Sequence, residues 1–98
     1  DPWRRQLLAV LRRHQALTAA AVATIAGLTS IPAQATYLAW IDCRGSGVAD
    51  PVAACVEAGL GPSDGRDFGA PGFIRLNLAC PTARLEAALV RLRQAFAR

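Results

Sequence analysis

Apolar residues recur at a helical spacing through the first third of the chain. The pattern predicts a helix of about 24 residues, roughly 36 Å long at 1.5 Å per residue. Asp1 is a suitable N-cap, Pro2 fits the first helical turn, and Gly27 is a suitable C-terminal stop. We expect one apolar face made of Trp3, Leu7, Val10, Leu11, Leu17, Ala21, Ile25 and Leu28.

Two later segments have the composition of β-strands. Residues 36–43, "TYLAWIDC", are mostly apolar on both faces, which predicts a central strand. Residues 72–80, "GFIRLNLAC", predict a second strand, which Pro81 ends. Before them, "LTSIPAQ" predicts a short extended piece and a turn around Pro32.

The remaining segments predict two more helices and a long loop. Asp50 and Pro51 repeat the start signal of the first helix and open a short helix that ends at Gly59. Residues 60–72 are rich in glycine and proline and predict a loop, with a brief strand near Leu60. The last 17 or so residues predict a helix by their periodicity, and its buried face contains Leu85, Leu89, Leu92 and Phe96.

This order of elements predicts one α+β domain over residues 1–98. Its small, mainly antiparallel sheet of about three to four strands would pack against the long first helix, the short middle helix and the C-terminal helix. With 98 residues, 53% of them apolar, and a mean hydropathy of +0.27, we expect either an unusually complete core or some apolar surface that meets a partner or a second domain. No uncharged apolar run is long enough for a membrane span, and the N-terminus does not have the layout of a signal peptide.

Two residue types are missing from the chain. It has no methionine and starts at Asp1, which we interpret as a segment cut from something longer. All 11 basic residues are arginine, so chemistry that needs a lysine amine cannot be completed by these residues. Arginine in place of lysine is also what a GC-rich genome encodes.

Charge and cysteine content exclude several function classes. The net charge is +4, but the arginines are spread along the chain without interleaved aromatic residues, which argues against nucleic-acid binding. Cys43, Cys55 and Cys80 form no CxxC pair, and His14 is the single histidine. We therefore expect no metal site, and three small buried thiols in a reducing cytoplasm.

The strand over residues 72–80 contains the candidate chemistry. Alternation places Phe73, Arg75, Asn77 and Ala79 on one face, and Ile74, Leu76, Leu78 and Cys80 on the core face. In one interpretation, Arg75 and Asn77 belong to the solvated face of an antiparallel sheet. In the other, Arg75 binds a carboxylate, because a guanidinium offers a planar, bidentate and permanently charged donor.

Other polar and aromatic residues have simpler interpretations. Tyr37 and Trp40 are typical sheet and core residues, although Tyr37 is also a candidate substrate contact. Asp42 is expected to pair with Arg44 or water, and Asp64 and Asp67 to form turns. Asn77 either steadies Arg75 or is solvated.

Three motifs in order carry a resemblance to a known family: "PAQATYLAWIDCR", "GPSDGRDFG", and "GFIRLNLACP" followed by a leucine-periodic helix. Together they resemble the C-terminal small domain of fold-type-I pyridoxal-phosphate enzymes, over essentially the whole chain. The aminotransferase-like C–S β-lyases, similar to cystathionine β-lyases, are the most similar group. The resemblance implies that Arg75 binds the α-carboxylate of an amino-acid substrate.

The resemblance also implies what lies outside this chain. The lysine that carries pyridoxal 5'-phosphate (PLP), and most groups that contact it, would belong to a large domain preceding this one. The first helix would partly pack on that domain, and the whole enzyme would be a cytoplasmic homodimer. The chain alone would then bind no cofactor and be inactive, with no catalytic residue of its own. Transamination and β-elimination stay open, as does a free-standing, non-enzymatic α+β ligand-binding or interaction module.

Overall fold

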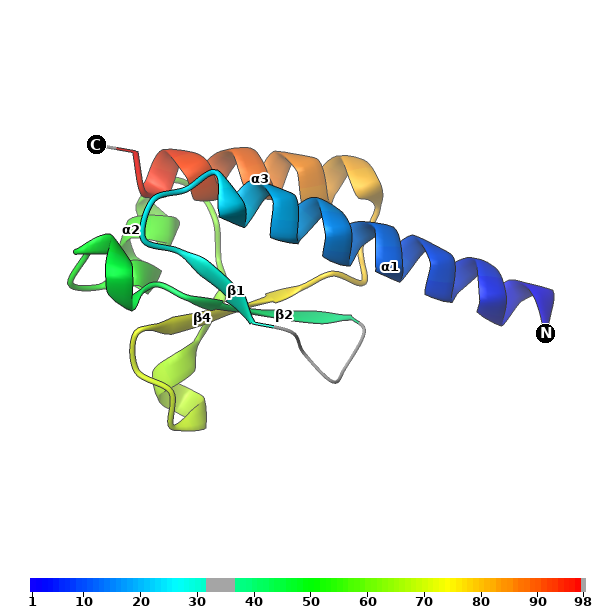
Figure 1. Cartoon of the computed structure of the whole chain (residues 1–98), viewed down its shortest axis with the longest axis horizontal. Helices are drawn as coiled ribbons and strands as arrows, with labels where there is room; N and C mark the ends of the chain where they lie inside the picture. Colours follow the sequence, from blue (N-terminus) through cyan, green and yellow to red (C-terminus); the bar gives the residue numbers. More distant parts are fainter. Residues whose placement is uncertain (32–36, 98) are drawn as a thin grey trace.

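The computed structural model describes residues 1–31 and 37–97, and it has the predicted α+β architecture (Figure 1). The predicted turn around Pro32 and the first residue of the predicted strand, Thr36, lie outside the described residues. The elements are helices α1 (Pro2–Ala23), α2 (Pro51–Glu57) and α3 (Thr82–Ala95), strands β1 (Thr29–Ile31), β2 (Leu38–Asp42), β3 (Ser63–Asp64) and β4 (Phe73–Asn77), and 3-10 turns η1 (Arg44–Ser46) and η2 (Gly65–Phe68).

The four strands form one antiparallel sheet in the order β1-β2-β4-β3. Strands β2 and β4 are therefore central, as the apolar content of β2 predicted. Ile31 pairs with Trp40, Trp40 with Arg75, and Arg75 with Ser63. Because directly paired residues share a face, these four side chains form one row across the sheet.

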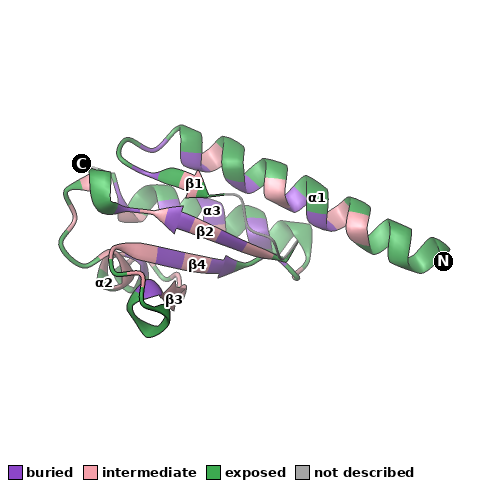
Figure 2. Ribbon diagram, turned by 60° about the horizontal axis from the view of Figure 1, so that its bottom comes forward, coloured by how far each residue is buried: buried purple, intermediate pink, exposed green. Residues whose placement is uncertain are grey.

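Helices α1 and α3 lie side by side over one face of the sheet, and η2 lies on the other side (Figure 1). The core fills the layer between the helices and the sheet (Figure 2). The alternation predicted for β4 is confirmed there, because Ile74, Leu76 and Leu78 are all buried. The predicted face of the last helix is also confirmed, with Leu85, Leu89, Leu92 and Phe96 buried.

The predicted apolar face of α1 is partly wrong. Its buried residues are Leu11, His14, Thr18 and Val22, whereas Trp3 is 69% exposed, and Leu7 and Leu17 are also exposed. The N-terminal end of α1 projects beyond the sheet (Figure 1), and its side chains Trp3 and Leu7 are exposed in the described part of the chain. Over the sheet, the helix turns a slightly different stripe inward, which includes two polar residues.

Helix α1 also ends earlier than predicted, at Ala23. Thr24 is the C-cap, and Gly27 lies in the turn that follows, with φ of +84°. A side chain at Gly27 would collide with the backbone of Gly45 in the neighbouring loop. A glycine is therefore needed at position 27 because the backbone after α1 passes close to η1, and not because it ends the helix.

Several other predicted boundaries shift. The brief strand predicted near Leu60 is present but lies slightly further along the chain, as β3 at Ser63–Asp64. The central strand begins at Leu38 and stops at Asp42, because Cys43 starts the turn into η1. Strand β4 is shorter than the predicted 72–80, because Asn77 accepts a hydrogen bond from the Ala79 backbone and turns the chain toward α3.

A buried histidine ties α1 to the sheet and to α3. The Nδ1 atom of His14 is 2.8 Å from the Leu78 carbonyl oxygen, and Nε2 is 2.9 Å from Oγ1 of Thr82. Because a carbonyl only accepts, Nδ1 donates to Leu78, and the Thr82 hydroxyl then donates to Nε2 of the neutral ring. Next to it, the side-chain amide of Gln15 donates to the Leu38 carbonyl at 2.9 Å. Helix α1 is thereby hydrogen-bonded to the chain at the end of β4 and the start of β2.

Candidate functional site

Arg75 lies in the middle of β4, between Trp40 on β2 and Ser63 on β3. Its side chain is half-buried and is on the face of the sheet opposite the helices. A residue in a central strand has its backbone fixed by hydrogen bonds on both sides. The fold therefore presents a charged side chain from a rigid base on a face that neither α1 nor α3 covers.

Two aromatic rings surround the Arg75 guanidinium. Its Cζ atom is 4.2 Å from the ring centre of Phe68 and 5.8 Å from that of Trp40. The two rings meet edge to face, with centres 5.7 Å apart and planes at 87°. Both distances are within the range of cation–π attraction, so the rings favour the charged group and shield it from water. Trp40 was expected in the core, but it is half-buried beside Arg75.

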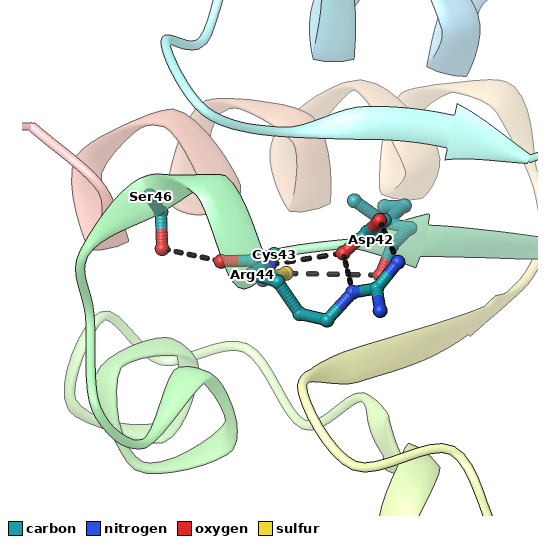
Figure 3. A network of polar contacts seen from close by, with 5 residues as sticks. Asp42, Cys43, Arg44 and Ser46 are labelled. Atoms are coloured by element: carbon teal, nitrogen blue, oxygen red, sulfur yellow. Dashed lines mark hydrogen bonds and ion pairs between the residues drawn. The ribbon is translucent and has the colours of Figure 1, made fainter.

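The guanidinium of Arg75 has no ion pair and no hydrogen bond within residues 1–31 and 37–97. The carboxylates of Asp42 and Asp64, on the two strands that pair with β4, bind other arginines. Oδ1 of Asp42 accepts from Nε of Arg44 at 3.0 Å, and Oδ2 accepts from Nη2 at 2.9 Å (Figure 3). Asp64 pairs with Arg66 through a single oxygen, because Oδ2 of Asp64 accepts from both Nε and Nη2 of Arg66, at 2.9 and 2.6 Å. The charge of Arg75 therefore has no anionic partner among the described residues.

Both carboxylates bind an arginine two residues further along the chain. The side-chain hydrogen bond from Arg44, with a second from its backbone N–H, holds the pKa of Asp42 below the usual value. Arg66 lowers the pKa of Asp64 by the same two contacts. The predicted pairing of Asp42 with Arg44 and the turn role of Asp64 are thus confirmed. Both carboxylates are stabilised in the charged form and are unsuited to accept protons near neutral pH.

A hollow of about 260 Å³ borders Arg75 where β3 begins and β4 ends. Two arginines line it: Arg75, and Arg84 from the first turn of α3. Ser63, Asn77 and Cys80 are also in the lining. Two arginines and no carboxylate contribute to this lining, so the hollow attracts anions rather than cations.

The other two candidate residues lie apart from the guanidinium. Oδ1 of Asn77 accepts from the Ala79 N–H at 2.8 Å, and its exposed side chain also borders the hollow. Tyr37 is 48% exposed, and its carbonyl oxygen accepts from the Leu78 N–H at 2.6 Å. In the described part of the chain, no hydrogen bond or ring contact joins either side chain to Arg75.

The cysteines differ from the expectation of three buried thiols. Cys43 and Cys55 are buried, but Cys80 is only half-buried. Burial raises the pKa of Cys43 to about 12 and that of Cys55 to about 11, so neither is a thiolate nucleophile at neutral pH. Among the described residues, no group of three His, Cys, Asp or Glu side chains is placed to hold a metal ion. None of the described helices has the length and apolar character that crossing a membrane requires.

Phe68 is the site residue that the sequence did not reveal. It lies in "GRDFGAPG", which predicts only a loop. The available signal was an isolated aromatic residue between turn formers, in a segment of otherwise small and polar residues. An aromatic ring in such a polar turn indicates packing against a side chain that is distant in sequence.

The chain is similar to several solved structures. No family model and no curated protein matches the chain. Solved structures do match: a protein named OvoB is 42% identical with a TM-score of 0.90, over 98% of this chain. A putative PLP-dependent β-cystathionase from Corynebacterium diphtheriae is 31% identical (TM-score 0.89, 99% of this chain), and a PLP-bound putative aminotransferase from Clostridium difficile is 27% identical (TM-score 0.87, 98% of this chain).

This chain is similar to PLP-dependent aminotransferases and to a β-cystathionase. It spans about a quarter of each of these three structures, 25%, 27% and 26% respectively. The predicted similarity to PLP enzymes is therefore confirmed at the level of fold and sequence. The position of the matched segment within a whole enzyme and the β-lyase group stay predictions.

The residues of this chain do not themselves fit the covalent attachment of PLP. That attachment needs a lysine amine, and the chain contains no lysine. The expectation that these residues make no cofactor contact stays a prediction.

Proposed function

We propose that this chain is the C-terminal small domain of a PLP-dependent aminotransferase or C–S β-lyase, in which Arg75 binds the α-carboxylate of the amino-acid substrate. The proposal rests on the surroundings of the Arg75 side chain. It is a half-buried arginine at the centre of a sheet, packed on an aromatic ring, with no anionic partner among the described residues. The similarity to PLP-dependent enzymes supports it.

The chemistry of Arg75 suits a carboxylate. A guanidinium donates two parallel N–H bonds to the two carboxylate oxygens, which fixes the direction of the substrate as well as its distance. When bound, PLP supplies the electron sink that stabilises negative charge at the substrate α-carbon. The contribution of Arg75 is to hold that carbon in one orientation, since a misplaced substrate loses much of the rate.

The remaining parts of the proposal follow from the family resemblance. The cofactor lysine and a large domain would belong to the same polypeptide, and two copies would form a cytoplasmic homodimer. Asn77 would support the site by fixing the chain after β4, through its hydrogen bond to Ala79. Tyr37 would contact the substrate from its exposed position before β2.

The proposal is tested on the whole protein that contains this chain. We expect the purified protein to show the visible absorbance of bound PLP and to turn over an amino acid. Conversion of L-cystathionine to a thiol, pyruvate and ammonia would assign β-elimination, whereas transfer of the amino group to a 2-oxo acid would assign transamination. A protein with neither PLP nor turnover would overturn the proposal and favour a free-standing binding module.

A further inference from the structure

We infer that Phe68 is a positioning residue that sets the orientation of the Arg75 guanidinium. This inference rests on the proposed function of Arg75. The Phe68 ring centre is 4.2 Å from Cζ of Arg75, closer than that of Trp40 at 5.8 Å. An arginine side chain has several rotatable bonds, and a contact on one face of its guanidinium selects among its conformations.

The 3-10 turn η2 holds Phe68 in place over Arg75. Asp64 caps the turn by accepting from the Arg66 N–H at 2.9 Å, and the Ala70 N–H donates to the Gly65 carbonyl at 2.8 Å. Gly65 is buried, and a Cβ atom there would collide with the carbonyl oxygen of Ala70. Gly69 closes the turn with φ of +73°, a conformation that favours glycine. The backbone around Phe68 is therefore fixed on both sides.

Trp40 contacts the Phe68 ring edge to face, with ring centres 5.7 Å apart. Its plane is at 87° to that of Phe68, and it is the direct cross-strand partner of Arg75. The two rings form a corner in which the guanidinium rests. The ring contacts leave the N–H donors of Arg75 without hydrogen bonds among the described residues, so they can bind a carboxylate while the ring contact persists.

The exposure of Phe68 argues against a role in the core. Its side chain is 51% exposed, and it does not belong to the buried cluster under the helices. Exposed side chains outside such clusters contribute little to stability. The orientation of Arg75 is therefore the function that the observed contacts of Phe68 support.

The test uses the PLP-loaded, full-length protein and its best amino-acid substrate. Phe68→Leu keeps an apolar side chain but removes the π-face, and we expect KM to rise about 3- to 30-fold with kcat within about twofold. The dissociation constant of the α-methyl analogue of that substrate, measured by calorimetry, should rise by the same factor. Phe68→Tyr keeps the ring and should restore both values. Val90→Ala is the matched control, since Val90 is similarly exposed at 52% and lies on α3.

A double-mutant cycle separates positioning from a structural effect. In an Arg75→Ala background, Phe68→Leu should change KM by less than about twofold, because Phe68 acts through Arg75. An equal rise in KM in both backgrounds, or failure of Phe68→Tyr to restore KM, would overturn the inference. Phe68→Met is the second variant if the leucine variant does not fold, with the same expected rise in KM.

The inference and the proposed function fail differently. If Arg75→Ala raises KM but Phe68→Leu does not, Arg75 binds the substrate and the positioning role is wrong. If Arg75→Ala leaves kcat/KM unchanged, the proposed function itself is wrong, whatever the Phe68 variants show.

Discussion

At the scale of single residues, the sequence predicted the position of Arg75 better than its surroundings. Alternation along one strand is a local property, and it placed Arg75 on the face away from the core, as observed. The contact with Phe68 depends on how the loop around η2 folds back across the sheet, which no local pattern specifies. Trp40 was predicted in the core because its strand is apolar, but the sheet has helices on only one face.

The three thiols should differ sharply in reactivity. Cys43 and Cys55 are buried, and burial raises their pKa values to about 12 and about 11, so at pH 8 both are protonated and inaccessible. We expect iodoacetamide to label half-buried Cys80 in the native protein, and the other two only after addition of denaturant. Peptide mapping by mass spectrometry measures this, with Cys80→Ser as the control. Native-state labelling of Cys43 as fast as that of Cys80 would contradict the described packing.

At the scale of elements, α3 and the central strands could be predicted, whereas the stripe of α1 could not. The buried face of α3 is defined by Leu85, Leu89 and Leu92, which recur at a helical spacing on one face of the helix. Apolar residues are spread widely around α1, so its buried face is decided by where the sheet lies beneath it. The result is a contact through His14 and Thr18 rather than through Leu17. The burial of a polar residue such as His14 cannot be predicted from the sequence of the helix, because its hydrogen-bond partners are distant in sequence.

His14 should be important for stability. It is 1% exposed and its two nitrogens bind Leu78 and Thr82. His14→Ala would leave the buried Leu78 carbonyl without this donor, and we expect the free energy of unfolding to fall by about 1–3 kcal/mol. Chemical denaturation monitored by circular dichroism measures the change. Gln6→Ala, at an exposed position on the same helix, is the matched control. Equal stability of the two variants would show that the buried histidine contact is not stabilising.

The turn after β2 should make stability depend on pH. The hydrogen bonds from Arg44 lower the pKa of Asp42 in the folded state, so charged Asp42 stabilises the fold above its unfolded pKa of about 3.9. That contribution is lost as the pH falls through the lower, folded pKa. We therefore expect Asp42→Asn to be less stable than the wild type at pH 7, with the difference shrinking below about pH 4. Thermal melts across this range measure it, and a difference that grows on acidification would contradict the pairing with Arg44.

At the scale of the whole molecule, two apolar surfaces are left open. The projecting end of α1 exposes Trp3 and Leu7, and the sheet face around Arg75 exposes Ile31 and Phe68. The high apolar content and the family resemblance predicted such a surface on the first helix, but not the one on the sheet face around Arg75. The chain spans about a quarter of each of three larger solved structures, two of them of PLP enzymes, and we propose that a large domain covers these surfaces in the whole protein.

The effect of Arg75→Ala on kcat/KM in the PLP-loaded, full-length protein tests the central claim most directly. A desolvated, bidentate contact between charged groups predicts a loss of about 2–4 kcal/mol, roughly a 30- to 1,000-fold fall in kcat/KM, with PLP binding unchanged. Arg75→Lys should recover only part of the loss, because the planar pair of donors is absent. An unchanged kcat/KM in Arg75→Ala would contradict the role of Arg75 as the anchor of the substrate carboxylate.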